Sequence, residues 1–196
     1  MKGGGAGDAS SGQRQGYWTE GAVPPNVSLG ENTLVSGEFA FKRFRSEKQP
    51  GLVIGANSTM DDVHFAAGVD ARIQIGDYCY FANALLLCEE EIRIGSYVVA
   101  GWNVTIADTD FHPVSPADRI ADAIAVSPLG NVKMRPLILR RPVIIDDGAW
   151  IGPSATILKG VRIGAGAFIE PGCVVVRDVP AGARVFGNPA QIMPAE

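Results

Sequence analysis

The chain has 196 residues, and its 17 Lys and Arg against 21 Asp and Glu leave a net charge of -4. This length suffices for one domain with a stable core, and the slight negative charge argues against a nucleic-acid-binding surface. Because there is no apolar run of the roughly 18 residues that span a membrane and no apolar N-terminal signal segment, the sequence predicts a cytoplasmic protein that acts on small molecules.

Two segments precede the regular part of the sequence. Residues 1–16 are rich in Gly and Ser and are expected to form a flexible tail. Residues 17–50 are expected to form a lead-in that caps one end of the core, and residues 51–196 the main domain. The lead-in carries a basic patch, which we interpret as a solvated face because no glycine loop accompanies it. This patch consists of Lys42, Arg43, Arg45 and Lys48.

A repeat of six residues begins at Val63. Apolar residues recur at this interval, and a second, mostly small apolar residue follows each of them by four positions. After one extra residue the pattern restarts at Ile94. We expect both sets to point inward: Val63, Val69, Ile75, Phe81, Leu87, Ile94, Ala100 and Ile106 in the first, and Ala67, Ile73, Cys79, Leu85, Val98 and Val104 in the second.

The repeat is interrupted at His112, where its spacing calls for an apolar residue. The following residues show no hexads and contain four prolines between Pro113 and Pro136. Residues 112–142 are therefore expected to leave the repeat as a protruding loop. Long loops on rigid scaffolds commonly carry function.

The repeat is strictest after the loop. Neither a helix of period 3.6 nor an ordinary strand of period 2 keeps positions six apart on one face, whereas short strands joined by tight turns do. Three hexads make one triangular coil, and coils stacked about 4.8 Å apart pair their backbone groups. The sequence therefore predicts an all-β parallel β-helix. Its inward sets here are Ile145, Ile151, Ile157, Ile163, Ile169 and Val175, with Ala149, Ala155, Val161, Ala167, Cys173 and Val179.

Two long stretches, "IGDYCYFANALLLCEEEIRIGSYVVAGWNVTIADTDFHP" and "PVIIDDGAWIGPSATILKGVRIGAGAFIEPGCVVVRDVPAGARVFGNPA", resemble the hexapeptide-repeat acyltransferases. The match covers roughly residues 51–190 and looks closest to the galactoside and maltose O-acetyltransferases and the sugar acetyltransferases of polysaccharide pathways. This resemblance implies a left-handed β-helix, a homotrimer, and acetyl-coenzyme A bound between neighbouring subunits.

The histidine of "DFHP", His112, matches the catalytic histidine of that family. Acetyl transfer to a hydroxyl or amine needs a general base, and an unperturbed imidazole has a pKa of about 6.5, so it is mostly neutral at pH 7. We therefore expect His112 to take the acceptor's proton and then to protonate the departing thiolate, without an acyl-enzyme. Asp108 and Asp110 are candidates for orienting the imidazole. His64 lies in a regular hexad and is interpreted as structural.

The resemblance places the pantetheine arm of coenzyme A along the later coils. Trp150, Gly152 and Ser154 in "AWIGPSAT" match family positions around the pantetheine, and Gly166 and Ala167 occupy the same stretch one coil later. The turns and the core of any such coil would also contain these small residues, even without a ligand. Trp150 is therefore more diagnostic of a donor site.

Two arginines near the C-terminus, Arg177 and Arg184, are candidate partners of the adenosine phosphates, with solvated side chains as the alternative. The stretch "IEPGCVVVRD" departs from the family pattern at Glu170, Cys173 and Val176. An acidic Glu170 beside the route of a phosphorylated ligand is unfavourable unless it points away.

For a sugar-like acceptor, the resemblance implies an asparagine and an acidic residue from the coil before the histidine. Asn83 and Glu89 lie nearest these positions, with Glu90 as the alternative to Glu89. Asp110 and Arg119, at the loop entrance, are further acceptor candidates. Amides and carboxylates suit polyols because they make several hydrogen bonds.

The residues leave other functions open. One is a non-catalytic β-helix that serves in assembly, and another is a metal enzyme of the γ-carbonic anhydrase type, which needs three histidines where this chain has two.

A cysteine nucleophile is a further alternative. Cys79 and Cys173 fall on inward positions, and Cys88 does not, but no histidine is near Cys88 in sequence. We expect no metal site and reduced thiols.

Overall fold

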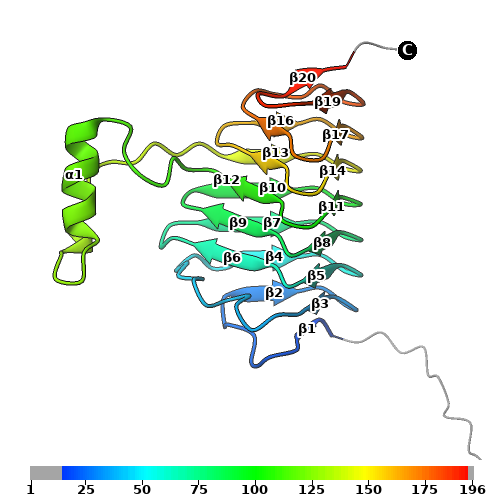
Figure 1. Cartoon of the computed structure of the whole chain (residues 1–196). Coiled ribbons are helices and arrows are strands. Elements are labelled where there is room, and N and C mark those ends of the chain that lie inside the picture. The colour runs from blue at the N-terminus through cyan, green and yellow to red at the C-terminus, as the bar shows by residue number, and fades with distance from the viewer. Residues whose placement is uncertain (1–14, 194–196) are drawn as a thin grey trace, which may run out of the picture.

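The computed structural model describes residues 15–193, so most of the expected N-terminal tail lies outside the described residues. Short parallel strands stack into a β-helix with three faces (Figure 1). We call the faces sheets A, B and C. Within the described residues, helix is confined to α1 (Pro116–Ala125) and the 3-10 turn η1 (Val132–Met134).

From β4 to β18, successive strands along the chain belong to sheets B, A and C in turn, so each complete coil contributes one strand to each sheet. Sheet A contains β1 (Tyr17–Trp18), β3 (Leu34–Val35), β5 (Thr59–Asp61), β8 (Tyr80–Ala82), β11 (Val99–Ala100), β14 (Trp150–Ile151), β17 (Phe168–Ile169), β19 (Arg184–Phe186) and β20 (Gln191–Ile192). Sheet B contains β2 (Val27–Leu29), β4 (Leu52–Ile54), β7 (Arg72–Ile75), β10 (Glu91–Ile94), β13 (Val143–Ile145) and β16 (Arg162–Ile163). Sheet C contains β6 (His64–Ala67), β9 (Leu85–Cys88), β12 (Thr105–Ala107), β15 (Thr156–Ile157) and β18 (Val174–Val175).

The ladder begins earlier than the hexads indicate. Strands β1 to β3 already pair in parallel with later coils, in the segment that the sequence analysis assigned to a lead-in. Residues Val27 and Leu52 are register partners 25 positions apart, whereas Ile144 and Arg162 are 18 apart. The first coils therefore contain insertions, and these conceal the repeat in the sequence.

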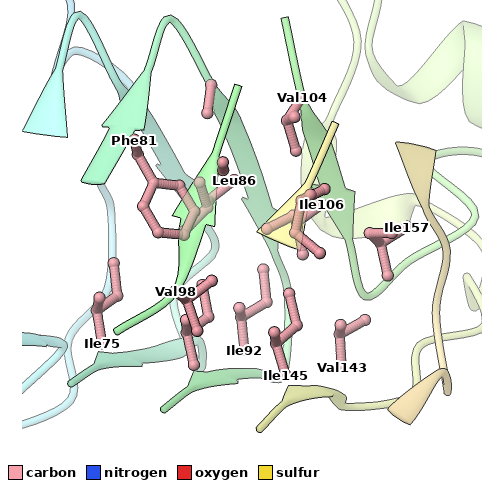
Figure 2. Close-up of a cluster of buried hydrophobic side chains, with 14 of the residues drawn as sticks. Ile75, Phe81, Leu86, Ile92, Val98, Val104, Ile106, Val143, Ile145 and Ile157 are labelled. Atoms are coloured by element: carbon pink, nitrogen blue, oxygen red, sulfur yellow. The ribbon is translucent and has the colours of Figure 1, made fainter. Parts of the chain in front are cut away.

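The core is a column of apolar side chains enclosed by the three sheets (Figure 2). Both inward sets predicted after residue 142 are buried, from Ile145 to Val179. Before the loop, the prediction of buried positions was wrong at Val69, Leu85 and Leu87. Val69 is exposed, and Leu85 and Leu87 are only half-buried because β9 turns Leu86 and Cys88 inward instead. Side chains alternate between the two faces of the four-residue strand β9, and its buried positions are shifted by one residue from the predicted ones.

The predicted loop is present, and we call residues 110–139 the arm. The arm leaves the coil between β12 and β13, and an antiparallel bridge between Thr109 and Arg140 closes its base. Despite this excursion, β10 and β13 pair in register, with Ile94 opposite Ile145. Figure 1 shows α1 standing well away from the stacked coils. None of the described helices is long and apolar enough to cross a membrane.

Candidate active site

His112 lies at the base of the arm, a short turn after the end of β12. The preceding residue, Phe111, has a φ of 64°, a left-handed backbone conformation that is uncommon for a bulky residue. The His112 backbone N–H donates to the Asp110 carbonyl at 2.7 Å, which completes this tight turn. The imidazole side chain is 60% exposed, so it faces solvent next to the end of sheet C.

A buried carboxylate from α1 holds the imidazole. His112 Nδ1 lies 2.5 Å from Asp122 Oδ2, and the Asp122 side chain is only 1% exposed. Arg135 Nε donates to Asp122 Oδ1 at 2.6 Å, and its Nη2 donates to Oδ2 and to the Phe111 carbonyl. Because a carboxylate only accepts, the proton belongs on Nδ1, and the lone pair of Nε2 is left free toward solvent.

Hydrogen bonds from Arg135 and then from His112 lower the pKa of Asp122 to about 2. The carboxylate is therefore ionised throughout the neutral range and can stabilise a positive imidazolium at His112. Arg135 partly neutralises the negative charge that Asp122 presents to the imidazole. The three side chains form one network that links α1, the segment after η1 and the base of the arm, and we call it the His112 clamp.

The two aspartates named as candidates for orienting His112 have other partners, and their carboxylates do not hold its imidazole. Asp108 is fully buried, and its carboxylate accepts the backbone N–H groups of Glu89, Glu90 and Glu91 at 2.7 to 2.8 Å. Asp110 pairs with Lys159, with 2.5 Å between Nζ and Oδ1. Both carboxylates thus fix the base of the arm to the coils.

Glu89 lies on the same side of the molecule as the His112 clamp. Burial and the neighbouring Asp108 raise the pKa of its carboxyl group, and Arg135, Arg140 and Arg45 oppose this effect. The Glu89 carbonyl accepts a hydrogen bond from Arg140 at 2.9 Å. Arg135 therefore connects Glu89 with the His112 clamp, because its positive charge acts on the Glu89 carboxyl group and its guanidinium binds Asp122.

Asn83 lies at the opposite edge of sheet C, at the corner that leads from sheet A into β9. Its φ is 47°, and its amide donates to Asp62 Oδ2 at 3.4 Å. It lines a shallow groove of about 260 Å³ together with His64, Asn103 and Thr105. Since His112 follows the C-terminal end of β12, one chain does not bring Asn83 and His112 together.

The donor-site candidates are divided between accessible and purely structural positions. The ring of Trp150 stacks on Phe168 on the outer face of sheet A, with centroids 4.3 Å apart and an angle of 21°. Ser154 is exposed at the corner between sheets A and C, with a φ of 59°. Ala167, by contrast, is 1% exposed and belongs to the core.

Both glycines among these candidates serve the coils themselves. A Cβ at Gly152 would lie 2.6 Å from the backbone nitrogen of Pro171, so only glycine fits this corner. Gly166 has a φ of 65°, which also favours glycine. Their presence is thus explained without a ligand.

Arg184 contacts its own chain rather than standing free. Its Nε donates to Glu170 Oε1 at 2.5 Å, and its guanidinium lies 5.2 Å from the centroid of Phe168. The carboxylate of Glu170 is thereby neutralised. Arg177 is exposed, and no hydrogen bond or ion pair joins its side chain to another part of residues 15–193. At the arm, the guanidinium of Arg119 donates to the carbonyl of Val114.

Sequence reasoning missed Asp122 and Arg135. The segment "SPADRIADAIA" contains a helix-start signal, with Pro at the first helical position, that would have predicted α1. Asp122 and Ala125 are the buried residues of α1, three positions apart on one face. No pattern in the sequence, however, connects this aspartate to His112.

The thiols have no catalytic environment. All three cysteines are free and buried, including Cys88, which the sequence analysis placed outside the core. Burial raises the pKa of Cys79 to about 11 and raises that of Cys88 further, with a contribution from Asp108. Within residues 15–193, no three His, Cys, Asp or Glu side chains gather in a way that could hold a metal ion.

Comparisons with known proteins find the same six-residue repeat in this chain. A family model for the bacterial transferase hexapeptide, six repeats, matches residues 142–177. Galactoside O-acetyltransferase of Lactococcus lactis subsp. lactis (strain IL1403) is 32% identical over 109 residues, which are 56% of this chain and 41% of that protein. The aligned part thus spans less than half the length of this relative.

Solved structures share the fold. A mutant of AntD, an N-acyltransferase from Bacillus cereus in complex with dTDP and coenzyme A, matches with a TM-score of 0.64 at 20% identity, over 85% of this chain and 83% of that chain. The polySia specific acetyltransferase NeuO matches with a TM-score of 0.56 at 18% identity, over 92% and 80% of the two chains. The resemblance drawn from the sequence is confirmed by these matches, and the β-helix fold contains the hexapeptide repeat over residues 142–177.

Proposed function

We propose that the protein is an acetyl-coenzyme A-dependent acetyltransferase that modifies a hydroxyl or amine of a sugar-like acceptor in the cytoplasm. The observation that carries this proposal is the His112 clamp, because a buried carboxylate fixes Nδ1 and leaves Nε2 free toward solvent. The names of the similar proteins, a galactoside O-acetyltransferase and an N-acyltransferase, support the reaction class. The buried free thiols fit a reducing compartment.

His112 acts as the base in a direct transfer. Nε2 accepts the proton of the acceptor hydroxyl or amine as its oxygen or nitrogen attacks the acetyl carbonyl carbon. Asp122 stabilises the imidazolium that forms. When the tetrahedral intermediate collapses, the bond from carbon to sulfur breaks, and Nε2–H returns the proton to the leaving thiolate. A positioned base of this kind contributes on the order of 10² to 10⁴ in rate.

The outer face of sheet A offers a surface for the donor. Trp150 and Phe168 form a flat aromatic stack on which a pantetheine arm can lie, and Ser154 can hydrogen bond to its amides. Of the two candidate arginines, Arg177 has the free guanidinium for a phosphate, since Arg184 is paired with Glu170. These residues would hold acetyl-coenzyme A and orient its thioester.

The acceptor residues require more than one copy of the chain. Asn83 and Trp150 lie on sheet A or its corner with sheet C, whereas His112 follows the far edge of sheet C. A homotrimer, as implied by the family resemblance, would place His112 of one subunit beside Asn83 and Trp150 of the next. Glu89, Asp110 and Arg119 would then complete the acceptor side from the arm's own subunit.

The test is release of free coenzyme A from acetyl-coenzyme A, measured against a panel of sugars and nucleotide sugars. His112→Ala is expected to lose turnover by at least about 10²-fold while still binding acetyl-coenzyme A in calorimetry. Asp118→Asn, at an exposed position on α1 outside the His112 clamp, is the control and should retain turnover. Failure of the wild type to bind acetyl-coenzyme A would reject the enzyme and favour a role in assembly.

A further inference from the structure

Two tyrosines stand at the corner that leads from sheet B to sheet A. Tyr78 lies in the turn between β7 and β8, and Tyr97 lies in the equivalent turn between β10 and β11. Their rings are stacked, with centroids 5.4 Å apart and an angle of 8°. The two residues are 54% and 61% exposed. We call them the tyrosine pair, and it shares no residue with the His112 clamp or the proposed donor surface.

The backbone of this corner does not favour tyrosine. Tyr78 and Tyr97 have φ values of 55° and 61°, in the left-handed region that is unfavourable for bulky side chains. All the equivalent positions of the other coils also have a positive φ, and they carry Asn or Gly, which tolerate it best. Backbone hydrogen bonds from coil to coil identify these positions as Asn32, Asn57, Gly148, Gly166 and Gly182. The tyrosine pair therefore departs from what the corner itself selects.

The fold gives the tyrosine pair no structural role that would explain this departure. Within residues 15–193, neither phenol hydroxyl makes a hydrogen bond, and neither ring stacks on a third ring. Both side chains lie outside the apolar core. At the first two steps of the corner, by contrast, the amide of Asn32 donates to Asn57 Oδ1 at 3.1 Å and so links neighbouring coils. An unfavourable backbone conformation without a structural role points to function.

One face of the Tyr97 ring looks onto an open position. On the side away from Tyr78, the next position of the corner is Gly148, which has no side chain. A Cβ at Gly148 would have only the backbone nitrogen of Gly166 near it, at 4.0 Å, and a Cβ at Gly166 would meet nothing within 4 Å. Since successive coils are about 4.8 Å apart, a ring-shaped ligand fits on Tyr97 as a third member of the stack.

Carboxylates flank this open position. Asp147 directly precedes Gly148 and is exposed. Its Oδ1 accepts the backbone N–H of Ser96 at 2.8 Å, which fixes the carboxylate, whereas its Oδ2 has no partner within the described residues. Asp77, directly before Tyr78, is fixed by the backbone N–H of Ala56 at 2.7 Å. No Lys or Arg of residues 15–193 forms an ion pair with either carboxylate, so the surroundings of the tyrosine pair are negative.

We propose that the tyrosine pair binds a neutral saccharide, at a site separate from the acceptor site at His112. The C–H bonds on one face of a sugar ring are attracted to the negative face of an aromatic ring, and hydroxyls at its edge donate to carboxylates. Tyr97 and Asp147 offer both kinds of contact around the position that Gly148 leaves open. The two aspartates repel phosphorylated and acidic sugars, which excludes nucleotide sugars from this site.

The tyrosine pair would stay accessible in the proposed trimer. His112 and Asn83 lie at the two corners that bound sheet C, and the trimer brings these corners of neighbouring copies together. Sheet C would then face the symmetry axis, and the corner between sheets B and A would point away from it. A long saccharide held there has a raised effective concentration at the acceptor site. This role rests on the proposed function, whereas the binding site itself does not.

Saturation-transfer difference NMR tests the site, because it detects weak binding of unlabelled sugars. The probes are neutral hexasaccharides of glucose, galactose and mannose, with choline as a cationic comparison. We expect at least one hexasaccharide to bind the wild type, and Tyr97→Asn to weaken its affinity about tenfold, the effect of one aromatic contact. Two other coils carry Asn at this corner, so the variant should keep the backbone.

Filling the open position gives a second test that leaves both rings in place. Gly148→Asn, at a φ of 68° that Asn tolerates, should weaken binding at least as much as Tyr97→Asn. Gly182→Asn is the matched control, because Gly182 lies at the same corner three coil steps from Tyr97, with the same φ of 68° and nothing within 4 Å of a Cβ. It should bind like the wild type.

Asn83→Gly separates this site from the proposed acceptor site and should leave the hexasaccharide bound at the tyrosine pair. A wild type that binds none of the hexasaccharides would overturn the proposal. Binding that survives both Tyr97→Asn and Gly148→Asn, or that is lost only in Asn83→Gly, would also overturn it. Tyrosine-dependent binding of choline alone would replace the saccharide by a cation. Because no turnover is measured, a protein that binds a hexasaccharide here but releases no coenzyme A would reject the proposed reaction and leave this site intact.

Discussion

Replacing Asp122 by Asn is the most informative change in the His112 clamp, because it removes one charge and almost no volume. Arg135 Nε lies 2.6 Å from Asp122 Oδ1 and requires an acceptor there. The introduced amide is therefore expected to keep its oxygen toward Arg135 and to turn its NH₂ group toward His112 Nδ1. A donor at this position forces the proton of a neutral imidazole onto Nε2.

The consequence is an imidazole with its lone pair on the wrong nitrogen. In serine proteases, the corresponding change at the triad aspartate lowers kcat by about 10⁴ through the same tautomer error. The His112 side chain is 60% exposed, so solvent can compensate in part. We therefore expect Asp122→Asn to lower kcat by on the order of 10², the lower end of the range for a positioned base.

The assay is coenzyme A release over a range of pH, combined with calorimetric binding of acetyl-coenzyme A. Binding and the KM for acetyl-coenzyme A should change little, since the clamp does not contact the aromatic stack on sheet A. Asp118→Asn, on the first turn of the same helix and exposed, is the matched control. The effects of Asp122→Asn and His112→Ala should not add, because both disable one base. Wild-type turnover in Asp122→Asn, or fully additive losses, would refute the role of the clamp.

Three further results are expected. Trp150→Ala should weaken acetyl-coenzyme A binding about tenfold in calorimetry by removing one ring of the stack, whereas Trp102→Ala, at an exposed corner, should not; equal effects would remove Trp150 from the donor site. Ile157→Ala should lower the free energy of unfolding by about 2–5 kcal/mol in urea denaturation because Ile157 is fully buried, and a smaller loss would mean that the coil collapses around the cavity. Since the pKa of Asp122 is lowered to about 2 from an ordinary value of 3.8, its ionised form stabilises the arm above pH 4, and limited proteolysis of the arm should accelerate as pH falls toward 2. A cleavage rate independent of pH across that window would contradict this assignment.

The fold was largely predictable because one geometric unit repeats. Where coils have 18 residues, as from Ile144 to Arg162, the sequence period and the structural period coincide, and every predicted inward position is buried. Before the arm, four-residue strands and insertions change the spacing. The expectations for Leu85, Leu87 and Cys88 failed there because period-2 alternation within β9 determines the buried face, and the expectation for Val69 failed because this residue lies in the turn after β6.

The site was predictable only where residue type and chain position are themselves informative. His112 interrupts the repeat, and Trp150 lies in a stretch that resembles the family positions around the pantetheine. Asp122 and Arg135 lie 10 and 23 residues after His112, and their meeting depends on how the arm folds back. Such contacts follow from tertiary structure, and no local period encodes them.

The uninterrupted pairing of β10 with β13 across the arm has an evolutionary consequence. The coils before and after the arm pair as if nothing separated them, with Ile94 opposite Ile145. Doubling the length of a flexible loop costs only about 0.6 kcal/mol in closure entropy, so arms of different size can be inserted at this point with little loss of stability. The scaffold can thus be inherited unchanged while the arm diversifies, and new acceptor preferences can arise by exchange of a single surface segment.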